Sequence, residues 1–323
     1  MSEPHLTIGL VAIGRNEGER LKRCLRSIPD DVPVVYVDSA STDDSVAFAR
    51  SMGATVVELD MRKPFSAARA RNEGFVALFE RGTTVTYVQF VDGDCELEAS
   101  WLELAANYLS TNAKVAAVCG RRRERFPDAS FYNRMCDDEW NTPVGQAAAC
   151  GGDAMIRVDA LEQVGTYDAG LIAGEEPELC QRLREAGWQI WRLDSPMTIH
   201  DADMHRFGQY WRRGIRSGFG YAQVLNKTFS GSGIKLYQRE VASAIFWTIG
   251  VTLFAILGAA LFGRIGLIVA PFIWTVQLLR LERRHGWTKA WHMLVGKIAE
   301  TIGILRFLSA RITGRDQGAI FYK

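Results

Sequence analysis

The chain has 323 residues, of which 48% are hydrophobic and 23% are charged. This length is typical of about two domains, and the composition excludes an intrinsically disordered protein. The net charge of +1 argues against a nucleic-acid partner. The charge is unevenly distributed, because residues 1–238 carry a net charge of −6 and residues 239–323 a net charge of +7. An acidic body followed by a basic, apolar tail indicates contact with a membrane surface.

Six cysteines are scattered along the chain, and no two of them have the C-x-x-C spacing of a zinc site or a redox pair. Single cysteines in a chain of this length are typical of small buried side chains in a reducing compartment. No basic stretch followed by a long apolar run begins the sequence, so no signal peptide is expected.

The first third of the chain alternates short apolar runs with helical patterns. This alternation predicts βαβ units and a mainly parallel sheet, in which ligands bind at the carboxyl ends of the strands. Asp38, Asp92 and Asp94 follow such predicted strand ends. The expected strands are 7–13, 32–37, 55–59 and 85–91, the expected helices are 21–28, 45–52 and 66–81, and the mixed α/β pattern continues with 115–119 (strand), 177–186 (helix) and 189–193 (strand).

An apolar segment begins with residues 241–262, which are 22 consecutive residues without a charge. A helix of this length spans about 33 Å, which is enough to cross the hydrocarbon core of a bilayer. Arg264 interrupts the segment, and residues 265–279 add 15 uncharged residues that include Pro271. We expect a transmembrane helical hairpin over 241–280 that turns near Arg264. A single span followed by a re-entrant or buried helix is the alternative.

Basic residues lie on the outer flanks of this predicted hairpin, and only Arg264 lies between its two apolar runs. The positive-inside rule therefore places both flanks, and with them the acidic N-terminal body, in the cytoplasm. The flanking residues are Lys235 and Arg239 before the hairpin and Arg280, Arg283, Arg284 and Lys289 after it.

The C-terminal segment combines apolar residues at helical spacing with interspersed charges, from Trp291 to Leu305. This pattern predicts an amphipathic helix that lies on the membrane interface. A helix that packs on the globular domain is the alternative. The predicted domains are an α/β domain (1–220), a juxtamembrane linker (221–240), the transmembrane hairpin (241–280) and a basic interfacial helix with its tail (281–323).

Asp92-Gly93-Asp94 directly follows a predicted apolar strand. Two carboxylates that flank a glycine form a compact negative site, and Mg²⁺ and Mn²⁺ prefer such oxygen ligands. A polar turn explains the same pattern, but the preceding βαβ pattern favours the metal site. His200 follows another predicted strand. A structural histidine is the ordinary explanation there, and a further metal ligand is the alternative.

Other charged residues allow both a structural and a functional explanation. Asp38 can begin a helix or bind a nucleotide base or ribose. Arg71 can lie on a solvated helix face or contact a diphosphate. Glu175 and Glu176 can stabilise a helix N-terminus or supply a general base. Arg212, among aromatic residues before the apolar segment, can anchor the chain at the interface or bind a phosphate.

Taken together and in order, these segments resemble family-2 glycosyltransferases with a GT-A fold, over about the first 220 residues. Asp92-Gly93-Asp94 resembles the D-x-D metal motif of the family, and His200 falls where GT-A enzymes often have a metal-binding histidine. The six segments that carry the resemblance are 11–17 (VAIGRNE), 37–43 (VDSASTD), 70–74 (ARNEG), 90–94 (FVDGD), 150–154 (CGGDA) and 174–188 (GEEPELCQRLREAGW).

The resemblance implies an inverting enzyme that binds a nucleotide-diphospho-sugar against Mg²⁺ or Mn²⁺. It implies that Asp94 is the principal metal ligand, with Asp92 and His200 beside it. It also implies that a carboxylate deprotonates the acceptor hydroxyl, and this base is assigned to Glu176, with Glu175 as the second choice. The donor-binding residues that the resemblance implies are Asn16, Glu17, Asp38, Arg71, Asp92 and Arg212.

Two departures from the family pattern bear on the mechanism. The usual Glu-Asp pair is Glu175-Glu176 here, and the extra methylene of Glu176 moves its carboxylate by about 1 Å. Residues 209–213 (QYWRR) only partly resemble the Q-x-x-R-W motif of processive polysaccharide synthases, because Arg213 replaces the tryptophan. Two short apolar runs are also too few for a polymer channel, so we expect a single-addition enzyme.

We therefore expect an inverting, metal-dependent glycosyltransferase that is anchored in the inner membrane with its active site in the cytoplasm. Its expected partners are a nucleotide-diphospho-sugar and a lipid-linked or glycan acceptor in bacterial polysaccharide or glycolipid assembly. A polyprenyl-phosphate glycosyltransferase and a non-catalytic nucleotide-sugar-binding membrane subunit are the alternatives. A nucleotidyltransferase is disfavoured, since no glycine-rich, lysine-containing loop lies near the N-terminus.

Overall fold

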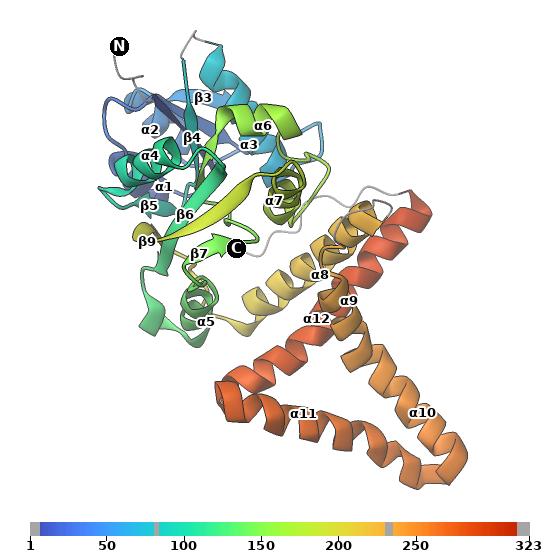
Figure 1. The fold of residues 1–323 in the computed structure, drawn as a ribbon. Coiled ribbons are helices and arrows are strands. Elements are labelled where there is room, and N and C mark those ends of the chain that lie inside the picture. Colours follow the sequence, from blue (N-terminus) through green and yellow to red (C-terminus); the bar gives the residue numbers. More distant parts are fainter. Residues whose placement is uncertain (1–6, 81–83, 230–234, 315–323) are drawn as a thin grey trace. The chain divides into compact units, whose positions relative to one another are not determined.

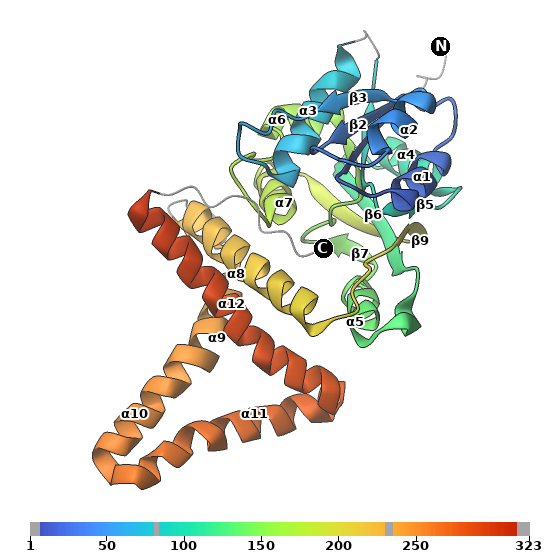
Figure 2. The same ribbon diagram turned by 180° about the vertical axis from the view of Figure 1, so that it is seen from behind.

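The computed structural model describes residues 7–80, 84–229 and 235–314. The chain divides into two compact units, Met1–His205 and Arg206–Lys323, which we call the N-terminal unit and the C-terminal unit (Figures 1 and 2). Each unit has its own packed interior.

The described part of the N-terminal unit contains one mixed sheet. Its strands are β1 (Ile8–Gly14), β2 (Val34–Asp38), β3 (Thr55–Glu58), β4 (Tyr87–Asp92), β5 (Cys95–Leu97), β6 (Val115–Glu124), β7 (Gly145–Ala147), β8 (Ala154–Arg157) and β9 (Gln189–His200). They lie in the order β3-β2-β1-β4-β8-β6-β9-β5, and β7 pairs with β9. The block from β3 to β4 is parallel, as is the β6–β9 pair, and the other pairs are antiparallel.

Helices cover the sheet of the N-terminal unit. They are α1 (Glu19–Arg26), α2 (Ser45–Ser51), α3 (Ala67–Phe79), α4 (Trp101–Thr111), η1 (Pro127–Ala129), α5 (Phe131–Glu139), α6 (Val158–Val164) and α7 (Glu175–Glu185). α3 packs against β1 and β2, and α4 packs against β6, β8 and β9. Parallel strands need such cover because both of their faces are apolar. The predicted α/β fold is confirmed, whereas the short strands β5, β7 and β8 were missed.

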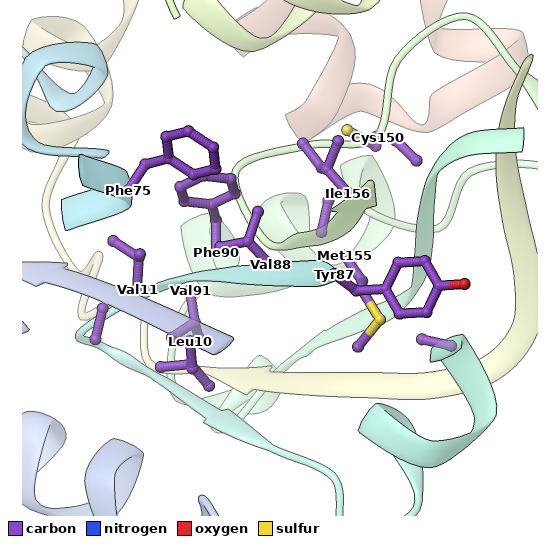
Figure 3. Packing of buried hydrophobic residues seen from close by; sticks show 14 of the residues in the cluster. Leu10, Val11, Phe75, Tyr87, Val88, Phe90, Val91, Cys150, Met155 and Ile156 are labelled. Carbon is purple, nitrogen blue, oxygen red and sulfur yellow. The ribbon is translucent and has the colours of Figure 1, made fainter. Parts of the chain in front are cut away.

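Buried side chains of the strands and of the helices that cover them form the core of this unit (Figure 3). Leu10 and Val11 of β1 and Val88 and Phe90 of β4 are at most 1% exposed. Burying a side chain of this size stabilises the fold by about 1.5–3 kcal/mol. This packing fixes β4, and therefore the position of the residues that follow its carboxyl end.

The C-terminal unit is helical in its described residues. Its elements are α8 (Phe207–Phe229), α9 (Gln238–Ile245), the π-helical turn η2 (Phe246–Gly250), α10 (Val251–Phe262), the 3-10 turn η3 (Gly263–Ile268), α11 (Val269–His285) and α12 (Trp287–Thr313).

α8 and α12 pack closely and run in the same direction (Figure 2). Near the start of both helices, the Tyr210 hydroxyl donates a hydrogen bond to the carbonyl oxygen of His292 at 2.7 Å. Further along both, a Cβ on Gly218 would lie 1.9 Å from the carbonyl oxygen of Glu300. Glycine at position 218 therefore lets the two helix backbones approach each other.

One helical run among the described residues, Gln238–His285, is long and apolar enough to cross a membrane. Large apolar side chains along it are exposed, among them Leu261, Phe262 and Ile265. Gly263, with a φ of +63°, interrupts the α-helical geometry, and α10 and α11 diverge from the turn that follows (Figures 1 and 2). The transmembrane hairpin itself stays a prediction.

The structure divides the chain after His205, whereas the α/β domain was predicted to end at residue 220. The reason for the difference is α8, which continues without interruption from Phe207 to Phe229. It includes the last residues of the predicted α/β domain and the first residues of the predicted linker. Residues 230–234 of that linker and 315–323 of the predicted tail lie outside the described residues.

α12 contains the segment that was predicted to lie on the membrane interface. One side of this helix packs inside the C-terminal unit, since Leu294 is 2% exposed and the Thr301 hydroxyl donates to the carbonyl oxygen of Ala244 at 3.0 Å. Trp291 and Leu305 are about half exposed. Part of the face that was predicted to lie on the membrane thus packs against other helices. Apolar spacing alone does not distinguish these two uses of a helix face.

Candidate active site

The loops after β1 and β2 are hydrogen-bonded to each other at the carboxyl edge of the parallel strands. The backbone N–H of Asn16 donates to Ser41 Oγ at 2.8 Å, and Asn16 Oδ1 accepts from the N–H of Thr42 at 2.6 Å. The N–H of Gly18 donates to the Asp43 carboxylate at 3.0 Å. Asn16 has a φ of +55°, which asparagine adopts more readily than most residues. Asn16 therefore joins two of the predicted donor-binding loops.

Asp38 ends β2 with its side chain almost fully buried. The Tyr36 hydroxyl donates to Asp38 Oδ1 at 3.0 Å, and the N–H of Ser41 donates to Oδ2 at 2.8 Å. Burial first, and the charge of Asp38 second, raise the pKa of Tyr36, so its hydroxyl stays protonated as a donor. Carboxylate oxygens accept more than one hydrogen bond, so Asp38 retains capacity for a ligand. Glu17, on the neighbouring loop, forms an ion pair with Arg20 at 2.9 Å.

Arg71 of α3 joins two of the predicted site carboxylates. Its guanidinium donates to Asp92 Oδ1 and to Glu175 Oε1, each at 2.8 Å, and its side chain is 4% exposed. The same guanidinium lies 5.5 Å from the centroid of the Tyr167 ring. A buried arginine that bridges two carboxylates fixes the orientation of both. The structure thus brings Arg71, Asp92 and Glu175 together, and the donor-binding role that the resemblance implies for Arg71 stays a prediction.

A second arginine, Arg122 of β6, completes the surroundings of Asp92. It lies 3.3 Å from Asp92 Oδ2 and 2.6 Å from the carboxylate of the buried Asp153. The backbone N–H of Asp92 donates to Asp153 Oδ1 at 3.0 Å. Burial alone raises the pKa of Asp92, but the charges of Arg71 and Arg122 outweigh it and hold the pKa below its ordinary value. Asp92 is therefore ionised at neutral pH.

The glycine loop between β7 and β8 passes directly beside this ion pair. A Cβ on Gly152 would lie 2.9 Å from a guanidinium nitrogen of Arg71 and 3.2 Å from Asp92 Oδ2. A side chain at this position would push into the Arg71–Asp92 contact. Glycine is required here for close approach.

Asp94 and His200 lie side by side because β5 and β9 pair in antiparallel register, with Cys95 opposite His200. Asp94 Oδ2 lies 3.3 Å from His200 Nε2. Burial lowers the pKa of His200, but Asp94 and then Glu124 raise it more, so the pKa lies above its ordinary value. The imidazole also packs edge to face against Trp140, with 4.6 Å between the ring centroids.

The Asp94–His200 pair fits a divalent cation. Two neighbouring ligands of octahedral Mg²⁺ or Mn²⁺ lie about 3 Å apart, close to the observed spacing of the oxygen and the ring nitrogen. The other ring nitrogen of His200 faces Glu124 Oε2 at 3.7 Å, an arrangement that resembles the carboxylate behind metal-binding histidines. Cys95 Sγ lies within the same group of ligand atoms, but Mg²⁺ and Mn²⁺ prefer oxygen and nitrogen ligands to sulfur.

Glu175 and Glu176 begin α7 and have different partners, although each is at most 9% exposed. Glu175 pairs with Arg71. Glu176 Oε1 accepts a hydrogen bond from the N–H of Cys150 at 2.6 Å and from the thiol of Cys180 at 3.0 Å. The hydrogen bond to Cys180 and then burial raise the pKa of Cys150 well above its ordinary value, so this residue is a neutral thiol. Glu175 therefore has a cation as its neighbour, whereas Glu176 has neutral hydrogen-bond donors.

Sequence reasoning missed Arg122, Asp153 and the contact of Cys150 with Cys180. Three consecutive arginines at the end of a buried strand were a usable signal for Arg122, because buried charges need partners. Nothing in the linear sequence pairs the two cysteines. Arg212 belongs to α8 of the C-terminal unit, and its donor-binding role stays a prediction.

The sequence model of glycosyl transferase family 2 matches residues 11–165, which include β1 to β4 and the Asp92-Gly93-Asp94 motif. Residues 11–165 form a glycosyl transferase family 2 domain. The chain is 24% identical over 223 residues to glycosyltransferase AglE of Haloferax volcanii. This alignment covers 65% of this chain and 71% of AglE. The chain is 25% identical over 213 residues to the succinoglycan biosynthesis protein ExoA of Rhizobium meliloti, and this alignment covers 62% of each chain.

The fold of this glycosyltransferase is also found in mannosyltransferase PcManGT of Pyrobaculum calidifontis, whose structure contains GDP-Man and Mn²⁺. The two structures align with a TM-score of 0.61 and 21% sequence identity, over 92% of this chain and 86% of PcManGT. The predicted GT-A fold is therefore confirmed.

Proposed function

We propose that this glycosyltransferase is an inverting, metal-dependent enzyme that moves a sugar from a nucleotide-diphospho-sugar to a hydroxyl group of a lipid-linked or glycan acceptor. The observation that carries the proposal is the side-by-side placement of Asp94 and His200, next to an Asp92 that two arginines hold. The GDP-Man and Mn²⁺ in PcManGT support the same classes of donor and metal for this chain.

Asp94 and His200 hold the divalent cation in this proposal, and Asp92 lies beside them. The cation, when bound, neutralises the charge that develops on the departing diphosphate. Asp38, at the carboxyl end of β2, accepts hydrogen bonds from the nucleotide. Arg71 and Arg122 keep Asp92 ionised and oriented.

We assign the general base to Glu176. Protonation of Glu175 would break its buried ion pair with Arg71, which is costly. Glu176 accepts hydrogen bonds from a backbone amide and a thiol, both neutral, so it can take the acceptor proton without the loss of an ion pair. Glu175 acts in this proposal as a positioning residue that holds Arg71 against Asp92.

The enzyme is anchored in the inner membrane, with the N-terminal unit in the cytoplasm. The apolar run Gln238–His285 and its exposed side chains support the anchor. The basic flanks of this run support the orientation. The name of ExoA, a succinoglycan biosynthesis protein, supports a role in polysaccharide assembly.

The test is a transfer assay with the full chain in detergent. A panel of GDP- and UDP-sugars is supplied with lipid-linked acceptors and Mg²⁺ or Mn²⁺, with and without EDTA. We expect turnover of one donor, an inverted anomeric configuration in the product, and a loss of at least about 100-fold in Asp94→Ala. Asp128→Ala is the matched control, because the Asp128 side chain is 86% exposed. Metal-independent turnover or a retained configuration would overturn the proposal.

A further inference from the structure

Cys150, Glu176 and Cys180 form a second group of potential metal ligands in the N-terminal unit. The two sulfur atoms lie 3.5 Å apart, and Cys180 Sγ lies 3.0 Å from Glu176 Oε1. Glu176 and Cys180 are four residues apart on α7, so they share one face of that helix. Cys150 reaches them from the loop before Gly151. All three ligand residues are at most 7% exposed.

We propose that these three residues bind a thiophilic divalent cation of the zinc class, and that the bound cation inhibits the enzyme. Two thiolates and a carboxylate are preferred ligands of Zn²⁺. Two sulfur ligands of tetrahedral Zn²⁺ lie about 3.8 Å apart, so the cysteines have to separate by only about 0.3 Å. Water takes the fourth position. Binding releases the two thiol protons to solvent, because thiolates are the ligands.

This site differs in ligand chemistry from the Asp94–His200 pair. Mg²⁺ and Mn²⁺ prefer oxygen ligands, whereas the sulfur atoms of Cys150 and Cys180 select a softer cation. One side of the Cys150 loop is open, since a Cβ on Gly151 would meet nothing within 4 Å. A cation can therefore approach without displacing the Arg71 ion pairs.

The inhibitory effect rests on the proposed function, in which Glu176 is the general base. A carboxylate that ligates a cation cannot take the proton of an acceptor hydroxyl. The enzyme is then active when this site is empty and inactive when it is filled. Metal binding itself does not depend on the assignment of the base.

The first experiment measures binding without activity. The full chain in detergent, kept reduced with a phosphine and saturated with Mg²⁺, is titrated with Cd²⁺ while the ultraviolet cadmium–thiolate band and proton release are recorded. We expect one Cd²⁺ per chain and about two protons released. Cys150→Ser and Cys180→Ser lose most of the band, whereas Cys95→Ser and Cys136→Ser retain it. Glu176→Gln keeps both thiols and binds at least about tenfold more weakly.

Two outcomes of this titration overturn the metal site. One is the absence of a stoichiometric cadmium–thiolate band in the unmodified protein. The other is a band that Cys95→Ser abolishes and Cys150→Ser retains, which would assign the ion to the group around Asp94. The Glu176→Gln variant keeps the test decisive if a serine variant fails to fold.

The second experiment measures inhibition. One equivalent of Zn²⁺ in saturating Mg²⁺ should lower transfer at least about tenfold, and a zinc-selective chelator should restore it. Cys136→Ser, a buried cysteine on α5, should be inhibited equally. Stoichiometric Cd²⁺ binding without inhibition by Zn²⁺ would overturn the inhibitory role and the base assignment, and would leave the metal site standing.

Discussion

His200 Nε2 lies 3.3 Å from Asp94 Oδ2 at the point where β5 pairs with the end of β9. β5 is only three residues long, and its pairing with β9 is what brings the D-x-D motif to the histidine. Sheet hydrogen bonds thus determine the spacing of the two proposed metal ligands. The proposed metal site is as rigid as the edge of the sheet that carries it.

Replacement of His200 tests its role as a ligand. His200→Ala removes one donor from the proposed site, so the Mn²⁺ concentration for half-maximal transfer should rise at least about tenfold. Turnover at saturating Mn²⁺ should fall less. Transfer assays over a Mn²⁺ series measure both quantities, with Asp128→Ala as the control. An unchanged Mn²⁺ requirement in His200→Ala would show that the imidazole is not a ligand.

The pH dependence of the Mn²⁺ requirement follows from the same contact. Burial lowers the pKa of His200, but Asp94 and Glu124 raise it above its ordinary value. Because this pKa is raised, protonation of His200 competes with Mn²⁺ binding even at pH values above about 6.5, the ordinary pKa of histidine. The Mn²⁺ requirement should therefore rise as pH falls, and His200→Ala should lose this rise. Mn²⁺ titrations between about pH 6 and pH 8.5 measure it. A constant requirement over this range would contradict the prediction.

Arg71 should be more important for stability than an exposed arginine. Arg71→Met leaves Asp92 and Glu175 without their shared cation, which should cost about 3–5 kcal/mol of unfolding free energy. Arg62→Met is the matched control, because the Arg62 side chain is 91% exposed and its loss should change stability by about 0.5 kcal/mol or less. Denaturant unfolding in detergent measures the difference. Equal effects of the two substitutions would show that the buried ion pairs contribute little.

Glu175 and Glu176 should differ in kinetic effect. Glu176→Gln removes the proposed base and should lower kcat by at least about 100-fold, with little change in the KM for the donor. Glu175→Gln weakens the contact that holds Arg71 against Asp92, so it should instead raise the metal concentration for half-maximal transfer and the KM for the donor. Steady-state kinetics of both variants measure this split. An unimpaired Glu176→Gln would favour a polyprenyl-phosphate acceptor, which is already an anion and needs no strong base.

Two glycines of α8 should respond differently to the same substitution. A Cβ on Gly218 would lie 1.9 Å from the carbonyl oxygen of Glu300, whereas a Cβ on Gly208 would meet nothing within 4 Å. Gly218→Ala should lower the stability of the C-terminal unit by about 1–3 kcal/mol, through overpacking between α8 and α12. Gly208→Ala should leave it unchanged or slightly higher, since alanine favours helices. Thermal unfolding in detergent compares them, and equal Tm values would contradict the observed helix contact.

Periodicity and motif order predicted the parts of this enzyme that depend on local sequence. The alternation of β1–β4 with α1–α3 was readable because buried strands and amphipathic helices have different periods. Asp92, Asp94 and His200 were identified by resemblance, and the structure brings Asp94 and His200 together. The positions of Asp92 and Asp94 on either side of Gly93 gave no sign that two arginines hold Asp92.

The ion-pair and hydrogen-bond partners of the buried charged residues could not be predicted, because partners come from distant segments of the chain. Arg71 pairs with Asp92 and Glu175, and Glu176 meets two cysteines, one of them 26 residues away. No periodicity links such residues. The compact units divide after His205 rather than at residue 220, because α8 continues through Gly218 and Gly220 as far as Phe229.

The hydrogen bonds of Asn16 with Ser41 and Thr42 have a thermodynamic consequence for any ligand at this edge. Two loops that are already joined in the folded chain do not have to be ordered when a ligand arrives. Ordering costs about 1–2 kcal/mol per backbone residue, so a preorganised edge keeps more of the contact energy as affinity. Disturbing the loop after β1 will therefore weaken a ligand that contacts only the loop after β2.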